Sequence, residues 1–127
     1  MARILYLAVA LVVVTHSMVE QGEARSCNDL KIQQTGTKCS SFTSGDQAMP
    51  SGECCNAMRA LRALVKTRTE RRQYCFCVHE LTSQNRHVRG SPSYPAARFP
   101  RIDSLPKKCG LPFLFSVDPK FNCNTVN

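Results

Sequence analysis

Eight cysteines are the residues of this 127-residue chain best suited to chemistry. Two are adjacent, two are separated only by Phe76, and four stand alone, in the order Cys27, Cys39, Cys54, Cys55, Cys75, Cys77, Cys109 and Cys123. So many cysteines in a short chain either form disulfides in an oxidising compartment or bind zinc. Structural zinc sites usually place two to four residues between paired ligands, and neither close pair has that spacing. We therefore expect four disulfides and no metal site.

Catalytic chemistry has little support elsewhere in the sequence. The histidines, His16, His79 and His87, have no recognisable nucleophile to activate once the cysteines are assigned to disulfides. The sequence contains neither a glycine-rich phosphate loop nor a nucleic-acid-binding motif. We expect a protein that is not an enzyme, needs no cofactor and does not bind nucleic acid.

The N-terminus has the pattern of a secretory signal peptide, residues 1–24. Arg3 precedes an uninterrupted apolar run at residues 4–14, and Gly22 and Ala24 are small residues at the two positions that signal peptidase reads. As a helix the run is only about 16 Å long, against about 30 Å for the hydrocarbon core of a bilayer. We expect cleavage after Ala24 and a secreted, monomeric domain of residues 25–127.

The chain is basic. Lysine and arginine number 17 against 9 acidic residues, a formal net charge of +8. This balance favours an anionic partner, such as a phosphate head group or a membrane surface. Part of the charge lies in a Pro-rich loop predicted at residues 82–100, whose arginines either bind an anionic membrane or are simply solvated.

Helical elements must position the cysteines, since the sequence shows no strand-rich pattern. The apolar spacing predicts helices over residues 27–41, over residues 51–66 with Ser51 as N-cap, and from a Thr69 cap to about residue 81. A short fourth helix is expected from Asp103 or Ser104 to Cys109, stopped by Gly110, and residues 111–121 form an irregular arm. Neighbouring cysteines on one helix point in different directions, so the two close pairs must tie several helices together.

The cysteine order and local motifs resemble the eight-cysteine plant superfamily of non-specific lipid-transfer proteins, seed-storage albumins and amylase or protease inhibitors. The framework spans residues 27–123, essentially the whole domain. Residues 105–111, Leu-Pro-Lys-Lys-Cys-Gly-Leu, are similar to the L-P-x-x-C-G-V segment of the lipid-transfer branch. Residues 70–75, Glu-Arg-Arg-Gln-Tyr-Cys, resemble its D-R-x-x-x-C segment.

This resemblance implies an all-α bundle of four helices with a C-terminal arm, four disulfides and an internal hydrophobic cavity for fatty acids, acyl lipids or phospholipids. It places the family's lipid-contacting arginine at Arg71, although a solvated helix-face charge is the alternative. Apolar residues of the helices and the arm would either line the cavity or fill a solid core. They are Leu61, Leu64, Val65, Val78, Leu81, Phe113, Phe115 and Val117.

The resemblance also implies disulfide pairs, Cys39 with Cys54 and Cys55 with Cys109. Cys27 pairs with either Cys77 or Cys75, and Cys123 pairs with the other. The final gap and residues 105–111 resemble the larger type of lipid-transfer protein, whereas the apolar Phe76 resembles the smaller type. Phe115 stands where many lipid-transfer proteins have a tyrosine, so a hydroxyl contact to a head group is missing there.

The predicted function is therefore a secreted lipid-binding and lipid-transfer protein, placed by the plant resemblance in the cell wall or apoplast. One alternative is a cationic defence protein that disrupts anionic microbial membranes. A further alternative is an inhibitor-like or storage relative.

Overall fold

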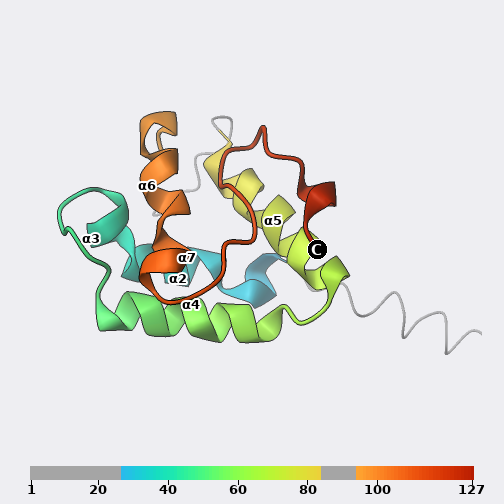
Figure 1. Ribbon diagram of the computed structural model, residues 1–127, viewed down its shortest axis with the longest axis horizontal. Coiled ribbons are helices and arrows are strands. Elements are labelled where there is room, and N and C mark those ends of the chain that lie inside the picture. Colours follow the sequence, from blue (N-terminus) through green and yellow to red (C-terminus); the bar gives the residue numbers. More distant parts are fainter. Residues whose placement is uncertain (1–26, 84–93) are drawn as a thin grey trace, which may run out of the picture.

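In the computed structural model, residues 27–83 and 94–127 are described, and every regular element in these two ranges is a helix (Figure 1). The predicted signal peptide and the central part of the predicted basic loop lie outside the described residues. The all-α class expected from the sequence is confirmed. Within the described ranges, no helix is long and apolar enough to cross a membrane.

The N-terminal segment is three short helices rather than the single one predicted over residues 27–41. They are η1 (Cys27–Leu30), α2 (Ile32–Lys38) and α3 (Ser40–Thr43). Lys31 adopts a left-handed conformation with φ of 53°, which turns the chain between η1 and α2. The apolar spacing did not reveal this break, because Lys is not a residue that commonly marks a left-handed position.

The second predicted helix is confirmed as α4 (Gly52–Leu64). The Ser51 hydroxyl accepts a 3.1 Å hydrogen bond from the Cys54 amide, so Ser51 is the N-cap expected from the sequence. Glu53 lies in the first turn, where the helix dipole favours an acidic side chain.

The third helix, α5 (Arg68–Thr82), begins earlier than predicted. Its cap is Thr67 rather than Thr69, because Thr67 and Glu70 form a reciprocal capping box. The Thr67 hydroxyl accepts from the Glu70 amide and the Glu70 carboxylate accepts from the Thr67 amide, each at 3.1 Å. The capping box gives two backbone amides an acceptor, whereas a cap at Thr69 would leave these two amides without one.

The helix predicted in the C-terminal half begins earlier than expected and is divided into short segments. The helices η2 (Ala96–Arg98), α6 (Phe99–Asp103) and α7 (Leu105–Lys108) replace a single helix expected to start at Asp103 or Ser104. Neither side chain caps a helix, because the Asp103 carboxylate binds the C-terminal arm and the Ser104 hydroxyl donates to the Arg101 carbonyl. Gly110 has φ of 76°, the left-handed stop predicted there.

Four disulfides link these helices. They also show which of the two possible partners, Cys77 or Cys75, is bonded to Cys27. The pairs are Cys27–Cys77, Cys39–Cys54, Cys55–Cys109 and Cys75–Cys123. The adjacent Cys54 and Cys55 thus bind α4 to α2 and to the end of α7. On α5, Cys75 and Cys77 are both buried and hold opposite ends of the chain, while Phe76 between them is 53% exposed. The apolar character of Phe76 therefore does not bring it inward.

The buried residues form two separate clusters rather than one core. The first surrounds α5 and the C-terminal arm and includes Leu61, Tyr74, Val78 and Phe115. The second lies between α4 and the α2 and α7 helices and includes Cys39, Phe42, Met58 and Leu105. The arm and a last short helix, η3 (Cys123–Thr125), pack beside α5 (Figure 1). This division of the core positions the candidate site.

Candidate functional site

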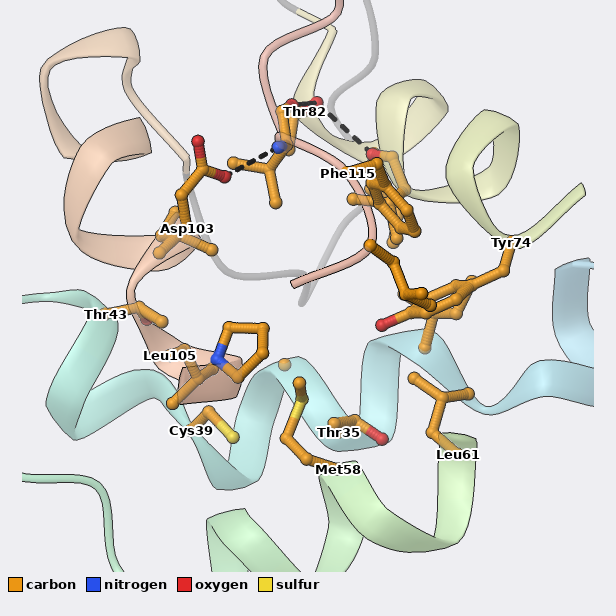
Figure 2. A pocket seen from close by; sticks show the side chains of 18 of the residues that line it. Thr35, Cys39, Thr43, Met58, Leu61, Tyr74, Thr82, Asp103, Leu105 and Phe115 are labelled. Atoms are coloured by element: carbon orange, nitrogen blue, oxygen red, sulfur yellow. Dashed lines mark hydrogen bonds between the residues drawn. The ribbon is translucent and has the colours of Figure 1, made fainter. Parts of the chain in front are cut away.

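A cavity of about 90 Å³ lies between the two core clusters and is lined by residues from both. Helices α2, α4, α5, α6 and α7 and the C-terminal arm contribute to its wall (Figure 2). The wall is mostly apolar, with Ile32, Met58, Leu61, Val78, Ile102, Leu105, Leu114 and Phe115 among its side chains. An apolar space of this kind suits a hydrocarbon chain better than a polar molecule.

The structure brings together several of the residues predicted to line a cavity. They come from three elements and are Leu61, Val78, Leu81, Phe115 and Val117. Three other predicted residues lie elsewhere. Val65 is buried in the first core cluster with Leu64 packed against it, and Phe113 is 56% exposed because the arm turns its ring outward.

Arg71, which the resemblance placed at the lipid, does not line the cavity. Its Nε donates to the Asn127 carbonyl at 2.5 Å and its Nη1 donates to the Lys66 carbonyl at 2.7 Å. The neighbouring Arg72 donates to the Val126 carbonyl at 2.8 Å. The two arginines thus hold the C-terminus and the corner between α4 and α5. Two of the five N–H donors of Arg71 thus bind backbone oxygens, and these bonds hold its guanidinium away from the cavity wall.

Arg62 is a cationic residue that does line the cavity, and it is not among the residues predicted from the sequence. The side chain is half-buried, its Nε is buried, and among the described residues this Nε has no hydrogen-bond partner. Burial lowers the pKa of the Arg62 guanidinium, and the Tyr74 hydroxyl within hydrogen-bonding reach opposes that shift. The sequence contains one indication that Arg62 could lie near the cavity. Arg62 is four residues after Met58, at the edge of the apolar stripe of α4.

Tyr74 supplies the hydroxyl at this point of the cavity. Its ring packs edge-on against Phe115, with centroids 4.9 Å apart and an interplanar angle of 81°. The side chain is buried and its hydroxyl is directed into the cavity (Figure 2). Burial raises the pKa of Tyr74 above its usual value, although the neighbouring Arg62 cation opposes the shift. Tyr74 is therefore a neutral hydrogen-bond donor at physiological pH.

The C-terminal arm is fastened over the cavity by two polar side chains. The Val117 amide donates to Asp103 Oδ1 at 2.8 Å, and the Ser116 hydroxyl donates to Asp103 Oδ2 at 2.6 Å. The Thr82 hydroxyl donates to the Val117 carbonyl at 2.7 Å (Figure 2). These bonds place Phe115 and Val117 in the wall, so the arm is both a structural element and one side of the site.

The cavity owes part of its shape to Gly36 and Tyr94, which both line it. A Cβ atom at residue 36 would collide with the Tyr94 hydroxyl. Only glycine allows α2 and Tyr94 to approach this closely, although glycine within a helix costs about 1 kcal/mol relative to alanine.

Known proteins are similar to this chain in sequence. A family model described as the protease inhibitor/seed storage/LTP family matches residues 17–123. The chain belongs to this family. Its relatives include non-specific lipid-transfer protein A of Ricinus communis, 30% identical over 102 residues, which cover 76% of this chain and 96% of the relative. Non-specific lipid-transfer protein 3 of Oryza sativa subsp. indica is 27% identical over 122 residues, covering 94% and 92% of the two chains.

Solved structures of other proteins share the fold. Non-specific lipid transfer protein 1 from barley, solved in complex with lysophosphatidylcholine, superposes with a TM-score of 0.61 at 22% identity. The alignment covers 81% of this chain and all of the barley protein. The hazelnut allergen Cor a 8 superposes with a TM-score of 0.59 at 21% identity. The expected superfamily and its helical, four-disulfide fold are thus confirmed.

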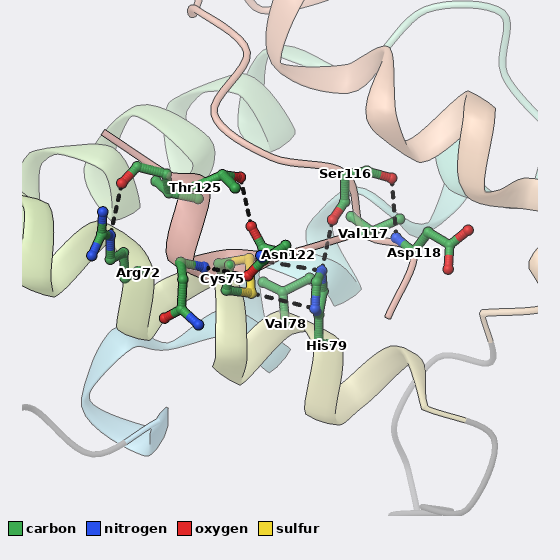
Figure 3. Close-up of a disulfide and its surroundings, with 12 residues drawn as sticks. Arg72, Cys75, Val78, His79, Ser116, Val117, Asp118, Asn122 and Thr125 are labelled. Atoms are coloured by element: carbon green, nitrogen blue, oxygen red, sulfur yellow. Dashed lines mark hydrogen bonds between the residues drawn. A yellow bond between two sulfur atoms is a disulfide. The ribbon is translucent and has the colours of Figure 1, made fainter. Parts of the chain in front are cut away.

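A cluster of three residues has the spacing of a metal site. The ligand atoms of Cys75, His79 and Cys123 are close enough together to hold a metal ion (Figure 3). Both sulfurs belong to one disulfide, so neither is a thiolate that could bind a metal or act as a nucleophile. His79 Nε2 lies 2.8 Å from the Ser116 carbonyl and Nδ1 lies 3.3 Å from Cys123 Sγ. With Nε2 protonated, the imidazole is a linker between α5 and the arm.

Proposed function

We propose that this protein is a secreted lipid-binding and lipid-transfer protein that carries fatty acids, acyl lipids or phospholipids in the cavity between its two core clusters. The observation that carries the proposal is the apolar wall of that cavity, built from both clusters and the arm. Burying a hydrocarbon chain there is favourable by about 0.8 kcal/mol for each methylene removed from water. Membership of the family and the names of its lipid-transfer relatives support the same function.

The disulfides explain how so small a domain tolerates an internal space. A cavity costs stability because the side chains around it lose packing partners. Each disulfide typically contributes about 2–4 kcal/mol, a large share of the total of about 5–15 for an ordinary domain. Cross-links between α4, α5 and their neighbours therefore compensate for the missing core.

Transfer proceeds by equilibrium binding and release, without covalent chemistry. The ligand's chain contacts Leu61, Val78, Leu81, Phe115 and Val117, which line the cavity. Release requires the arm to move, and the hydrogen bonds of Asp103 and Thr82 to the arm are the contacts that must break. The protein acts as a monomer, and residues 1–24 direct its export to the cell wall or apoplast and are removed during that export.

Titration of the folded, oxidised protein with saturated fatty acids and lysophospholipids of increasing chain length tests this proposal. Saturable binding that tightens with chain length, at both low and physiological salt, is the expected result. The reduced and alkylated protein is the control, since it contains the same charges without the disulfides. Absence of saturable binding, together with salt-sensitive leakage of anionic vesicles, would overturn the carrier proposal in favour of a cationic membrane-active protein.

A further inference from the structure

Two large apolar side chains are exposed near the C-terminal end of α7. Met49, in the loop before α4, is 58% exposed, and its sulfur lies 4.0 Å from the Lys108 ammonium. Phe113, in the first part of the C-terminal arm, is 56% exposed. Neither side chain lines the cavity, so the cavity does not account for their apolar character.

A backbone hydrogen bond brings Phe113 close to α7. The Leu111 amide donates to the Pro106 carbonyl at 2.8 Å, so the arm begins beside this helix. Phe113 follows two residues later, and an extended chain advances only about 3.3–3.6 Å per residue, which keeps the two Cα atoms within about 7 Å. The exposed ring therefore lies close to the helix that ends in Lys107 and Lys108.

Arg59 on α4 adds a third cation at the same place. Its Nη2 donates to the Cys109 carbonyl at 2.9 Å and its Nη1 donates to the Asn56 side-chain oxygen at 3.2 Å, where the arm leaves α7 beside α4 (Figure 1). The side chain is exposed, so its charge stays at the surface. Glu53 in the first turn of α4 is the one acid of that helix, and residues 105–114 contain none. Cations thus exceed acids around the two apolar side chains.

We propose that this surface docks on an anionic lipid bilayer. It is called the α7 face and consists of Met49, Arg59, Lys107, Lys108 and Phe113. The three cations attract anionic head groups, and the two apolar side chains gain free energy by entering the boundary between head groups and acyl chains. The inference rests on the proposed function, because a carrier has to meet the surfaces between which it moves lipid.

A second copy of the chain fits this face poorly. A symmetric dimer would place the α7 face of one copy against the same face of the other. Arg59, Lys107 and Lys108 would then oppose identical charges, which disfavours association. An anionic bilayer offers the complementary charge.

The α7 face borders the cavity. Pro106 precedes the two lysines and lines the cavity, and Leu114 follows Phe113 and lines it as well. Docking through this face therefore places the α7 and arm side of the cavity wall against the bilayer. A lipid would be taken up or released at that side.

A tryptophan reporter tests the inference, because the chain contains no tryptophan of its own. Phe113→Trp places the reporter in the α7 face. Phe76→Trp is the matched control, since Phe76 is 53% exposed on α5, one helical turn before the exposed Glu80 and outside the face. The vesicles contain equal parts of phosphatidylglycerol and phosphatidylcholine, and the phosphatidylcholine has brominated acyl chains that quench tryptophan on contact.

We expect the fluorescence of Phe113→Trp to shift to the blue and to be quenched when these vesicles are added, since tryptophan prefers the membrane interface. The fluorescence of Phe76→Trp should change little. Vesicles of brominated phosphatidylcholine alone should quench neither variant strongly, because they lack the net negative charge that attracts the cations.

The lysines are tested in the Phe113→Trp background. Lys107→Gln combined with Lys108→Gln should weaken vesicle binding about 10- to 30-fold at low salt. Lys66→Gln combined with Arg68→Gln is the control, because it removes the same charge from exposed positions outside the α7 face, and it should weaken binding by less than about threefold. Circular dichroism establishes that each variant is folded.

Equal quenching of Phe113→Trp and Phe76→Trp, or equal losses in the two double variants, would overturn the inference, because binding would then depend on net charge alone. Self-association that Phe113→Ser abolishes would also overturn it, in favour of a second copy. Titration with laurate in the absence of vesicles separates the inference from the proposed function. Docking without laurate binding would contradict the carrier function and confirm the α7 face, whereas laurate binding without docking would do the reverse.

Discussion

The backbone amide of Val117 donates a 2.8 Å hydrogen bond to Asp103 Oδ1 and thereby joins the C-terminal arm to α6. The same carboxylate accepts from the Ser116 hydroxyl at 2.6 Å, so one acidic side chain fixes two consecutive residues of the arm. Because Val117 and Phe115 line the cavity, this side chain determines how firmly one wall of the site is held.

Replacement of Asp103 by alanine should loosen the arm. We expect a loss of about 1–3 kcal/mol in the free energy of unfolding, since the Ser116 hydroxyl and the Val117 amide lose a charged acceptor. Urea denaturation measures the loss, and hydrogen exchange at the Val117 amide should become faster. Asp46→Ala is the control, because Asp46 is exposed in a loop and accepts a hydrogen bond from the Ser44 hydroxyl. Equal effects of the two substitutions would contradict the role assigned to Asp103.

Two half-buried leucines differ in their position relative to the cavity. Leu81 lines the cavity, whereas Leu64 packs beside the first core cluster without lining it. Replacement of either by alanine should cost about 1–2 kcal/mol of stability through lost apolar burial. Only Leu81→Ala should also weaken binding of laurate, by about threefold to tenfold. Calorimetric titration of both variants checks this, and a similar loss in Leu64→Ala would show that the cavity wall is misassigned.

Removal of individual disulfides should destabilise the protein unequally. The Cys75–Cys123 bond joins residues 48 apart, and the Cys39–Cys54 bond joins residues 15 apart. Loop-closure entropy in the unfolded chain then predicts losses of about 4 and about 3 kcal/mol for the corresponding double alanine variants. Denaturant unfolding measures both losses. The opposite order would show that packing around Cys39 and Cys54 outweighs the entropy of the unfolded chain.

Stability should fall at alkaline pH because of Tyr74. Burial raises the pKa of Tyr74 above the usual tyrosine value of about 10, so the folded protein holds this proton more tightly than the unfolded chain does. The unfolded state therefore loses its proton first, and the free energy of unfolding decreases as the pH rises above about 10. Tyr74→Phe should reduce that decrease. The pKa of Tyr94 is also raised by burial, so Tyr94→Phe is the comparison that isolates the share of Tyr74.

Export should remove residues 1–24 and leave Arg25 as the first residue of the secreted protein. Mass spectrometry of the protein recovered from the medium of expressing plant cells measures this N-terminus. Ala24→Phe should block cleavage there, because signal peptidase requires a small residue immediately before the cut. A secreted protein that retains residues 4–14 would contradict the assignment.

Much of the local structure could be predicted from the sequence because its causes are local. Ser51 caps α4 through the amide of a residue three positions later, and Gly110 adopts the conformation that glycine most readily allows. The spacing of Thr67 and Glu70 is that of a capping box and is equally visible in the sequence, so the prediction of Thr69 as the cap is wrong. By contrast, neither apolar spacing nor residue type indicated the left-handed Lys31 that divides the N-terminal segment.

The candidate site was harder to predict, because long side chains reach several ångströms from their helix. Arg62 begins at the edge of the apolar stripe of α4, yet its Nε is buried in the wall of the cavity. Arg71 matches the family's motif, but its guanidinium binds the carbonyls of Lys66 and Asn127. Such assignments depend on which other element approaches the helix, and the position of a residue along one helix contains no such information.

The sequence by itself determined the all-helical class, the family framework of eight cysteines, the Cys39–Cys54 and Cys55–Cys109 pairs and the main start and stop signals of the helices. These features follow from contacts within a few residues or from a cysteine order that the whole family shares. The tertiary structure decided that Cys27 pairs with Cys77 and that Arg62, rather than Arg71, lines the cavity with Tyr74. The reason is physical: a cavity exists only where α4, α5, α7 and the arm pack around a common space, and that packing selects which side chains are turned inward.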